Sequence, residues 1–141
     1  MSQQLPPDRG ASAVSYVSPV NPLVPGFHLR VDLDGAQPVA HCSGVLDGEG
    51  AAAKVQPELM KLHEAIVAAK ASSVRLELQD VSYMNSNGIK AFAVWFLKAE
   101  GSREHSYAID LVYNPEVPWQ RWSVGALQVL TPRALRLVPK R

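Results

Sequence analysis

Hydrophobic and polar residues alternate along several short segments of the chain, and each such segment predicts a β-strand. In FHLRVDL, residues 27–33, every second side chain is apolar, which is the period of a strand with one face in a core. VAHCSGVLD, residues 39–47, follows after the turn sequence DGAQP, so these two strands are expected to form a hairpin. Further strands are expected over residues 72–81, 106–114 and 135–139.

Between the strands, apolar residues recur at the spacing of helices. In residues 48–70, four apolar side chains share one helical face: Leu59, Leu62, Ile66 and Ala69. Pro57 is expected in the first turn of this helix, where its missing N–H costs nothing. Two more helices are expected, one over about residues 88–99 that Gly101 closes, and one over residues 115–130.

The order of these elements, β-β-α-β-α-β-α-β, predicts the fold class. Strands that are joined through a helix pair in parallel by right-handed crossovers, whereas the first two strands form an antiparallel hairpin. We therefore predict a single α/β domain over residues 26–141, with one mixed β-sheet packed with α-helices. Residues 1–25 hold five of the eleven prolines of the chain, and they are expected to form a flexible tail.

Length and composition agree with one folded domain. The chain has 141 residues, of which 47% are hydrophobic and 19% charged, as is usual for a folded soluble protein. Fourteen basic and thirteen acidic residues give a net charge of +1. So balanced a charge argues against nucleic acid or an anionic membrane as the main partner.

The N-terminal sequence and the cysteine content predict a cytoplasmic protein. MSQQLPPDRGASAV lacks the basic start and the apolar stretch of a secretion signal. The longest uncharged apolar run, residues 91–97, is much shorter than a membrane span. The single cysteine, Cys42, cannot form an internal disulfide, which fits a reducing compartment.

No metal or cofactor is expected from the sequence. The four histidines show no spacing typical of metal ligands. DGEGAAAK, residues 47–54, contains glycines but lacks the spacing of a phosphate-binding loop.

One short segment, NSNG at residues 85–88, lies between a predicted strand and a predicted helix. Serine and asparagine side chains accept hydrogen bonds from the free N–H groups at the start of a helix, and glycine favours turns. A turn that only caps the helix is therefore one interpretation of this segment. The other is that one of its side chains carries the function.

The longer stretch LELQDVSYMNSNGIKAF, behind a hairpin and a first helix, resembles the STAS domain of bacterial anti-sigma-factor antagonists. In that family the third strand runs into a D-S-S-G loop, and a helix begins at once. The matching positions here are Asn85, Ser86, Asn87 and Gly88. The element order is similar over about residues 26–141, and the match in sequence covers about fifteen residues. Asn85 and Asn87 replace the aspartate and the second serine of the family.

The resemblance implies a non-enzymatic regulator of signal transduction and transcription that switches partners. In the family, a serine kinase of the histidine-kinase-like ATPase fold phosphorylates the first serine, and a metal-dependent serine phosphatase removes the phosphate. The unphosphorylated form binds the kinase or anti-sigma factor. By position the phosphoacceptor is Ser86, with Asn85 and Asn87 shaping the switch loop and Gly88 permitting the turn. A helix start also favours an added phosphate, because its N–H groups and dipole attract anions.

The helix after this loop is apolar on two faces. The first face carries Ile89, Phe92, Ala93 and Phe96. The second carries Ala91, Val94, Trp95 and Lys98. Either neighbouring elements cover the second face, or Val94 and Trp95 belong to a surface for docking or for a homodimer. The candidates for partner contact are Ile89, Lys90, Val94 and Trp95.

Two tryptophans, Trp119 and Trp122, lie three residues apart in the last predicted helix. Core packing is expected for at least one of them. Two functional alternatives also stay open: a STAS-type interaction module without phosphoregulation, as the two asparagines suggest, and a small-molecule-sensing STAS domain with a pocket under the NSNG loop.

Overall fold

The computed structural model describes residues 16–103 and 105–140, and its elements follow the predicted order β-β-α-β-α-β-α-β. The elements are β1 (Phe27–Asp32), β2 (Val39–Leu46), α2 (Ala51–Ala69), β3 (Ser73–Met84), α3 (Ser86–Gly101), β4 (Ala108–Tyr113), α4 (Pro118–Leu130) and β5 (Leu135–Pro139). The predicted α/β fold class with a mixed sheet is confirmed.

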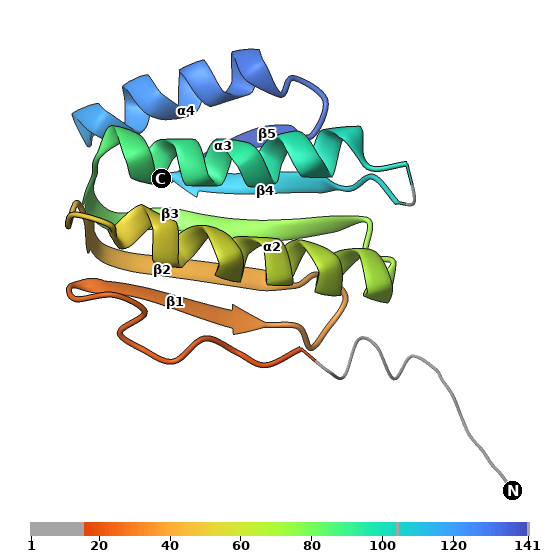
Figure 1. Ribbon diagram of the computed structural model, residues 1–141. Helices are drawn as coiled ribbons and strands as arrows, with labels where there is room; N and C mark the ends of the chain where they lie inside the picture. The colour runs from red at the N-terminus through yellow and green to blue at the C-terminus, as the bar shows by residue number, and fades with distance from the viewer. Residues whose placement is uncertain (1–15, 104, 141) are drawn as a thin grey trace, which may run out of the picture.

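The strands form one five-stranded sheet in the order β1-β2-β3-β4-β5. β1 is antiparallel to β2, and the remaining neighbours are parallel. Each of the crossovers advances by one strand in the same direction, so right-handed connections place α2, α3 and α4 on one face of the sheet, as Figure 1 shows. The domain therefore has two layers.

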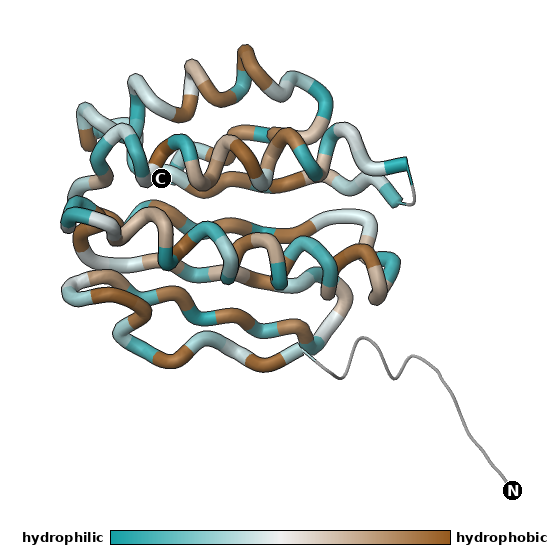
Figure 2. The backbone as a smooth tube through the Cα atoms, in the orientation of Figure 1, coloured by the Kyte–Doolittle hydropathy of each residue, from teal (hydrophilic) through white to brown (hydrophobic). Residues whose placement is uncertain are grey.

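The core lies between the helices and the sheet. Figure 2 shows hydrophobic residues recurring along the strands and helices, interrupted by polar ones. On β1, Phe27 and Leu29 are fully buried, whereas Arg30 and Asp32 are exposed. The alternation in the sequence thus separates the core face of the sheet from its open face.

The position of Pro57 differs from the prediction. α2 begins at Ala51, so Pro57 lies in the helix interior rather than in the first turn. A proline there removes one helical hydrogen bond, which leaves the carbonyl of Ala53 without its usual donor. Both residues are exposed, so that water can bind the carbonyl.

The part of the predicted tail that the structure describes contacts the domain. The side chain of Asn21 binds both backbone groups of Leu29 on the outer edge of β1, with Nδ2 3.0 Å from the carbonyl oxygen and Oδ1 2.9 Å from the nitrogen. Val24 is buried in the core. Residues 1–15, also in the predicted tail, lie outside the described residues.

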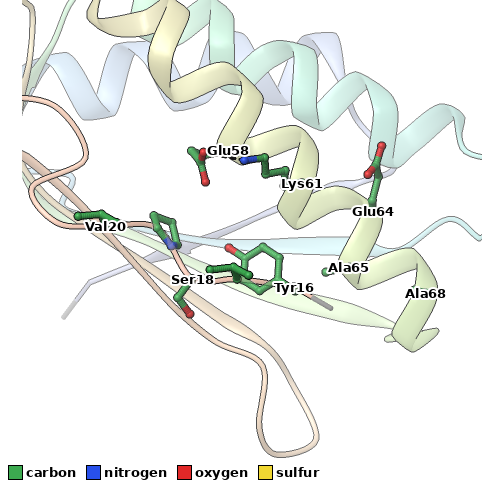
Figure 3. Close-up of a pocket in the computed structure, with 10 residues that line it drawn as sticks. Tyr16, Ser18, Val20, Glu58, Lys61, Glu64, Ala65 and Ala68 are labelled. Carbon is green, nitrogen blue, oxygen red and sulfur yellow. Dashed lines mark hydrogen bonds and ion pairs between the residues drawn. The ribbon is translucent and has the colours of Figure 1, made fainter. Parts of the chain in front are cut away.

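The same N-terminal segment and α2 enclose a pocket of about 530 Å³ (Figure 3). The hydroxyl group of Tyr16 is buried there and has no hydrogen-bond partner within residues 16–103 and 105–140, and Figure 3 shows it directed toward Glu58 and Lys61. Burial, together with the nearby Glu58 carboxylate, raises the pKa of Tyr16 to about 12. The phenol is therefore neutral at neutral pH. The pocket shares no lining residue with the NSNG loop.

Trp95, predicted as a partner contact, is a core residue. It is 0% exposed, and its ring lies against Phe92 and Phe96. Its Nε1 donates a hydrogen bond to the hydroxyl oxygen of Tyr107 at 2.7 Å, and Nδ1 of His63 is 2.7 Å from the same oxygen. The prediction of a surface position is thus wrong, because Tyr107 and α2 cover this part of α3.

We predict that Trp95→Ala lowers the free energy of unfolding by about 3–5 kcal/mol, since it leaves a cavity in the core. Leu97→Ala is the control on the same helix, because Leu97 is 46% exposed, and it should change stability by less than about 1 kcal/mol. Urea denaturation followed by far-UV circular dichroism measures both values. Equal effects of the two substitutions would contradict the buried position of Trp95.

Candidate functional site at the start of α3

The NSNG loop lies where two parallel strands end together. Leu46 at the end of β2 is the register partner of Met84 at the end of β3. The backbone N–H of Asn85 donates to the carbonyl oxygen of Leu46 at 2.9 Å. The loop is therefore at the carboxyl edge of the sheet, where α/β proteins commonly place binding sites.

Asn85 is the N-cap of α3. Its backbone is extended, and its Oδ1 accepts a hydrogen bond from the N–H of Gly88 at 2.9 Å. Its carbonyl oxygen accepts from the N–H of Ile89 at 3.0 Å, which closes the first turn. Ser86 is consequently the first residue of the helix, which begins there rather than near Gly88.

Ser86 and Asn87 are both exposed. Within residues 16–103 and 105–140, neither side chain makes a hydrogen bond. Helical geometry also leaves the N–H groups of these first residues without acceptors in their own helix. The first turn of α3 contains no acidic side chain, so nothing within that turn opposes an anion beside the positive end of the helix dipole.

Gly88 is required for space rather than for an unusual backbone conformation. It is buried as a helical residue and is not among the glycines with positive φ. A Cβ atom at this position would be 2.6 Å from Cγ of Met84 and 2.9 Å from Cδ2 of Leu46. The predicted role of permitting a turn is thus corrected: Gly88 lets α3 start in contact with the ends of β2 and β3.

A cleft of about 480 Å³ lies between the starts of α2 and α3. The turn before α2 contributes Asp47 and Glu49, and α3 contributes Asn87, Lys90 and Val94. The cleft therefore has two carboxylates on one side and an ammonium group on the other. Sequence patterns did not indicate these two carboxylates as part of the site, because they are distant from the NSNG loop along the chain.

The structure separates the four predicted contact residues. Lys90 and Val94 line the cleft. Ile89 is half-buried and packs against the core, and Trp95 is fully buried. Lys90 and Val94 are therefore the two that a partner seated in the cleft can reach.

α4 supports the end of β3 through two side chains that the sequence did not indicate as site residues. Nε2 of Gln120 donates to the carbonyl oxygen of Val81 at 2.8 Å, and Nε1 of Trp119 donates to the same oxygen at 3.2 Å. Gln120 is fully buried, and Trp119 packs against the core. The expectation that at least one of the two tryptophans packs in the core is met by Trp119.

None of the helices in residues 16–103 and 105–140 has the length and apolar character needed to cross a bilayer. Over the same ranges, no three histidine, cysteine, aspartate or glutamate side chains are grouped so as to hold a metal ion.

Comparison with known structures identifies the fold. The chain is similar to the crystal structure of an anti-sigma factor antagonist from Mycobacterium paratuberculosis, with a TM-score of 0.55 and 20% sequence identity over 84% of this chain and 89% of that chain. No protein-family model matches the sequence, and no curated protein matches it. The chain has the STAS-like fold of an anti-sigma factor antagonist, as its sequence predicts.

We predict that Asn85→Ala lowers the free energy of unfolding by about 1 kcal/mol, because the N–H of Gly88 loses its cap. Asn85→Asp should keep that stability, since a carboxylate oxygen can accept the same bond and favours the helix dipole. Asn87→Ala is the control without a capping bond. Thermal or urea unfolding compares the three variants, and equal losses for Asn85→Ala and Asn87→Ala would contradict the cap.

Proposed function

We propose that this protein is a non-enzymatic signalling regulator in which reversible phosphorylation of Ser86 changes the partner that it binds. The observation that carries the proposal is the exposed hydroxyl group of Ser86 at the first position of α3. By the resemblance of the sequence to anti-sigma-factor antagonists, this position corresponds to their regulatory serine. The N-cap at Asn85 and the close packing of Gly88 support the proposal, because they hold the start of α3 in place.

A phosphoryl group on Ser86 changes the charge of the site more than its shape. It adds about −2 charge beside the free N–H groups of the first helical turn. Lys90 lies four residues further along the helix and therefore on the same side, so its ammonium group can pair with the phosphate. Asp47 and Glu49 on the other side of the cleft repel it. Phosphorylation thus alters the electrostatic match with a partner without refolding the domain.

The two asparagines are compatible with phosphoregulation as well as with its loss. Asn85 supplies the capping bond to Gly88, which an aspartate at this position would also supply. Replacing that aspartate by Asn85 removes a negative charge next to Ser86, so it lowers the electrostatic cost of the phosphate. Asn87 is exposed and leaves the hydroxyl of Ser86 accessible.

The proposed partners follow from the same site. A kinase of the histidine-kinase-like ATPase fold phosphorylates Ser86, a serine phosphatase removes the phosphate, and the unphosphorylated form binds the kinase or an anti-sigma factor. The protein then regulates transcription in the cytoplasm. The cleft beside Asn85 and Asn87 favours one second candidate, a sensor that binds a small molecule there.

Ser86 is expected to be the only residue that gains a phosphoryl group from the serine kinases encoded beside its gene. Intact-mass spectrometry after incubation with each purified kinase and ATP should show one added phosphoryl group on the wild type and none on Ser86→Ala. Ser82→Ala is the matched control, because Ser82 is also exposed and should leave phosphorylation unchanged. Absence of phosphate on the wild type, or its persistence on Ser86→Ala, would overturn the proposal.

Partner binding should depend on Ser86 and on the cleft. Ser86→Glu and Lys90→Ala are each expected to weaken the unphosphorylated complex about tenfold, as removal of well-placed interface groups commonly does. Leu97→Ala is the control, since Leu97 is exposed on α3 outside this cleft. Isothermal titration calorimetry with the kinase or anti-sigma factor measures the affinities. If Ser86→Glu and the wild type bind the partner with equal affinity, the result favours an interaction module without phosphoregulation. If a metabolite raises the thermal stability of the protein and no protein partner binds, the result favours the small-molecule sensor.

A further inference from the structure

α4 carries an apolar face that the described parts of the domain leave exposed. Its inner side buries Gln120, Val124 and Leu127. On the outer side, Trp122 is 73% exposed, Val129 83% and Leu130 50%. With the exposed Ala126, these residues recur at i, i+4, i+7 and i+8, so they form one stripe along the helix. Contiguous exposed apolar groups of this kind mark interaction surfaces.

The middle of this stripe carries only small residues. Gly125 lies in the helix interior, where glycine costs about 0.5–1 kcal/mol relative to alanine. A Cβ atom on Gly125 would meet nothing within 4 Å, so the fold of its own chain gives no reason for the missing side chain. Together with Ala126 it leaves a depression between Trp122 and Val129. Such a profile lets a second helix approach to about 8 Å.

We propose that the occupant of this face is a second copy of the same chain, and that the two α4 helices cross antiparallel on a two-fold axis at Gly125 and Ala126. Residues equally far from the axis on opposite sides then face each other. Trp122 of one copy lies on Val129 and Leu130 of the other, and the small residues meet at the axis. The stripe, large at both ends and small in the centre, is self-complementary in this orientation.

The charges at the two ends of α4 favour the antiparallel orientation. Glu116 is exposed just before the helix, and Arg133 is exposed just after it. Among the described residues, Arg133 has one weak ion pair, with Nε 3.9 Å from Oε2 of Glu100. In the antiparallel pair each Glu116 lies near Arg133 of the second copy, whereas a parallel pair would bring like charges together.

The size of the face predicts a weak dimer. Stable interfaces bury about 1,200–2,000 Å² in total, and one helical stripe from each copy falls at or below the lower limit. Arg121 lies over the ring of Trp122, with its guanidinium carbon 5.7 Å from the ring centre. This contact limits the motion of the ring before association, which reduces the entropy lost on binding. We expect dissociation constants of about 1–100 μM.

Sedimentation velocity of the full chain tests the proposal. From about 0.1 μM to 500 μM, the mean mass of the wild type should rise from near 15.3 kDa toward twice that value. Trp122→Glu should raise the dissociation constant at least about tenfold. Val20→Glu is the matched control, because Val20 is equally apolar and exposed but lies on the N-terminal segment. A wild type that stays monomeric, or equal effects of both substitutions, would overturn the proposal.

Charge reversal tests the orientation. Glu116→Arg and Arg133→Glu should each weaken the dimer severalfold, and the double variant should regain wild-type affinity, because each pair is restored with its signs exchanged. Failure of the double variant to recover would exclude the antiparallel arrangement. If Trp122→Glu abolishes binding of the signalling partner and leaves the mass distribution unchanged, the face serves that partner and the dimer proposal is wrong. Neither outcome depends on whether Ser86 is phosphorylated.

Discussion

The start of α3 contacts the ends of β2 and β3 so closely that a Cβ atom at position 88 would be 2.6 Å from Cγ of Met84 and 2.9 Å from Cδ2 of Leu46, and would force these side chains to shift. This contact fixes the direction in which the helix leaves the sheet. The bond from the N–H of Asn85 to the carbonyl of Leu46 ties the cap to the neighbouring strand. Because the loop is held from both sides, Ser86 is exposed at a fixed position, and a modification there changes surface charge rather than backbone conformation.

The N-cap connects local structure to the proposed regulation. An oxygen atom at position 85 is needed for the N–H of Gly88, and either an asparagine or an aspartate side chain provides it. Their difference is one unit of charge beside Ser86. Asn85 therefore keeps the geometry of the helix start and changes only the electrostatics, so the departure from the family pattern at this position leaves the fold intact.

Local patterns predicted the elements, whereas contacts between distant residues decided the details of the site. The alternation over residues 27–33 and the helical spacing over residues 48–70 were enough for the order of strands and helices. The predicted surface position of Trp95 was wrong because α3 is apolar on two faces. Which of these faces is buried depends on residues outside the helix, such as Tyr107. The cleft was not predicted either, because it also depends on contacts between distant parts of the chain. Asp47 and Lys90 line the same cleft only once α2 and α3 have packed together.

The two edges of the sheet constrain how the chain associates with other proteins. The outer edge of β1 is occupied at Leu29 by the side chain of Asn21, and β5 is a short strand that ends at Pro139, which has no N–H to donate. Both features oppose extension of the sheet by another strand. The cleft beside Asn85 and Asn87 and the apolar face of α4 are two side-chain surfaces with different chemistry. In the proposed mechanism, a phosphate on Ser86 changes the charge beside the cleft and leaves the apolar face of α4 unchanged, so the proposed partner switch and the proposed α4 contact are independent of each other.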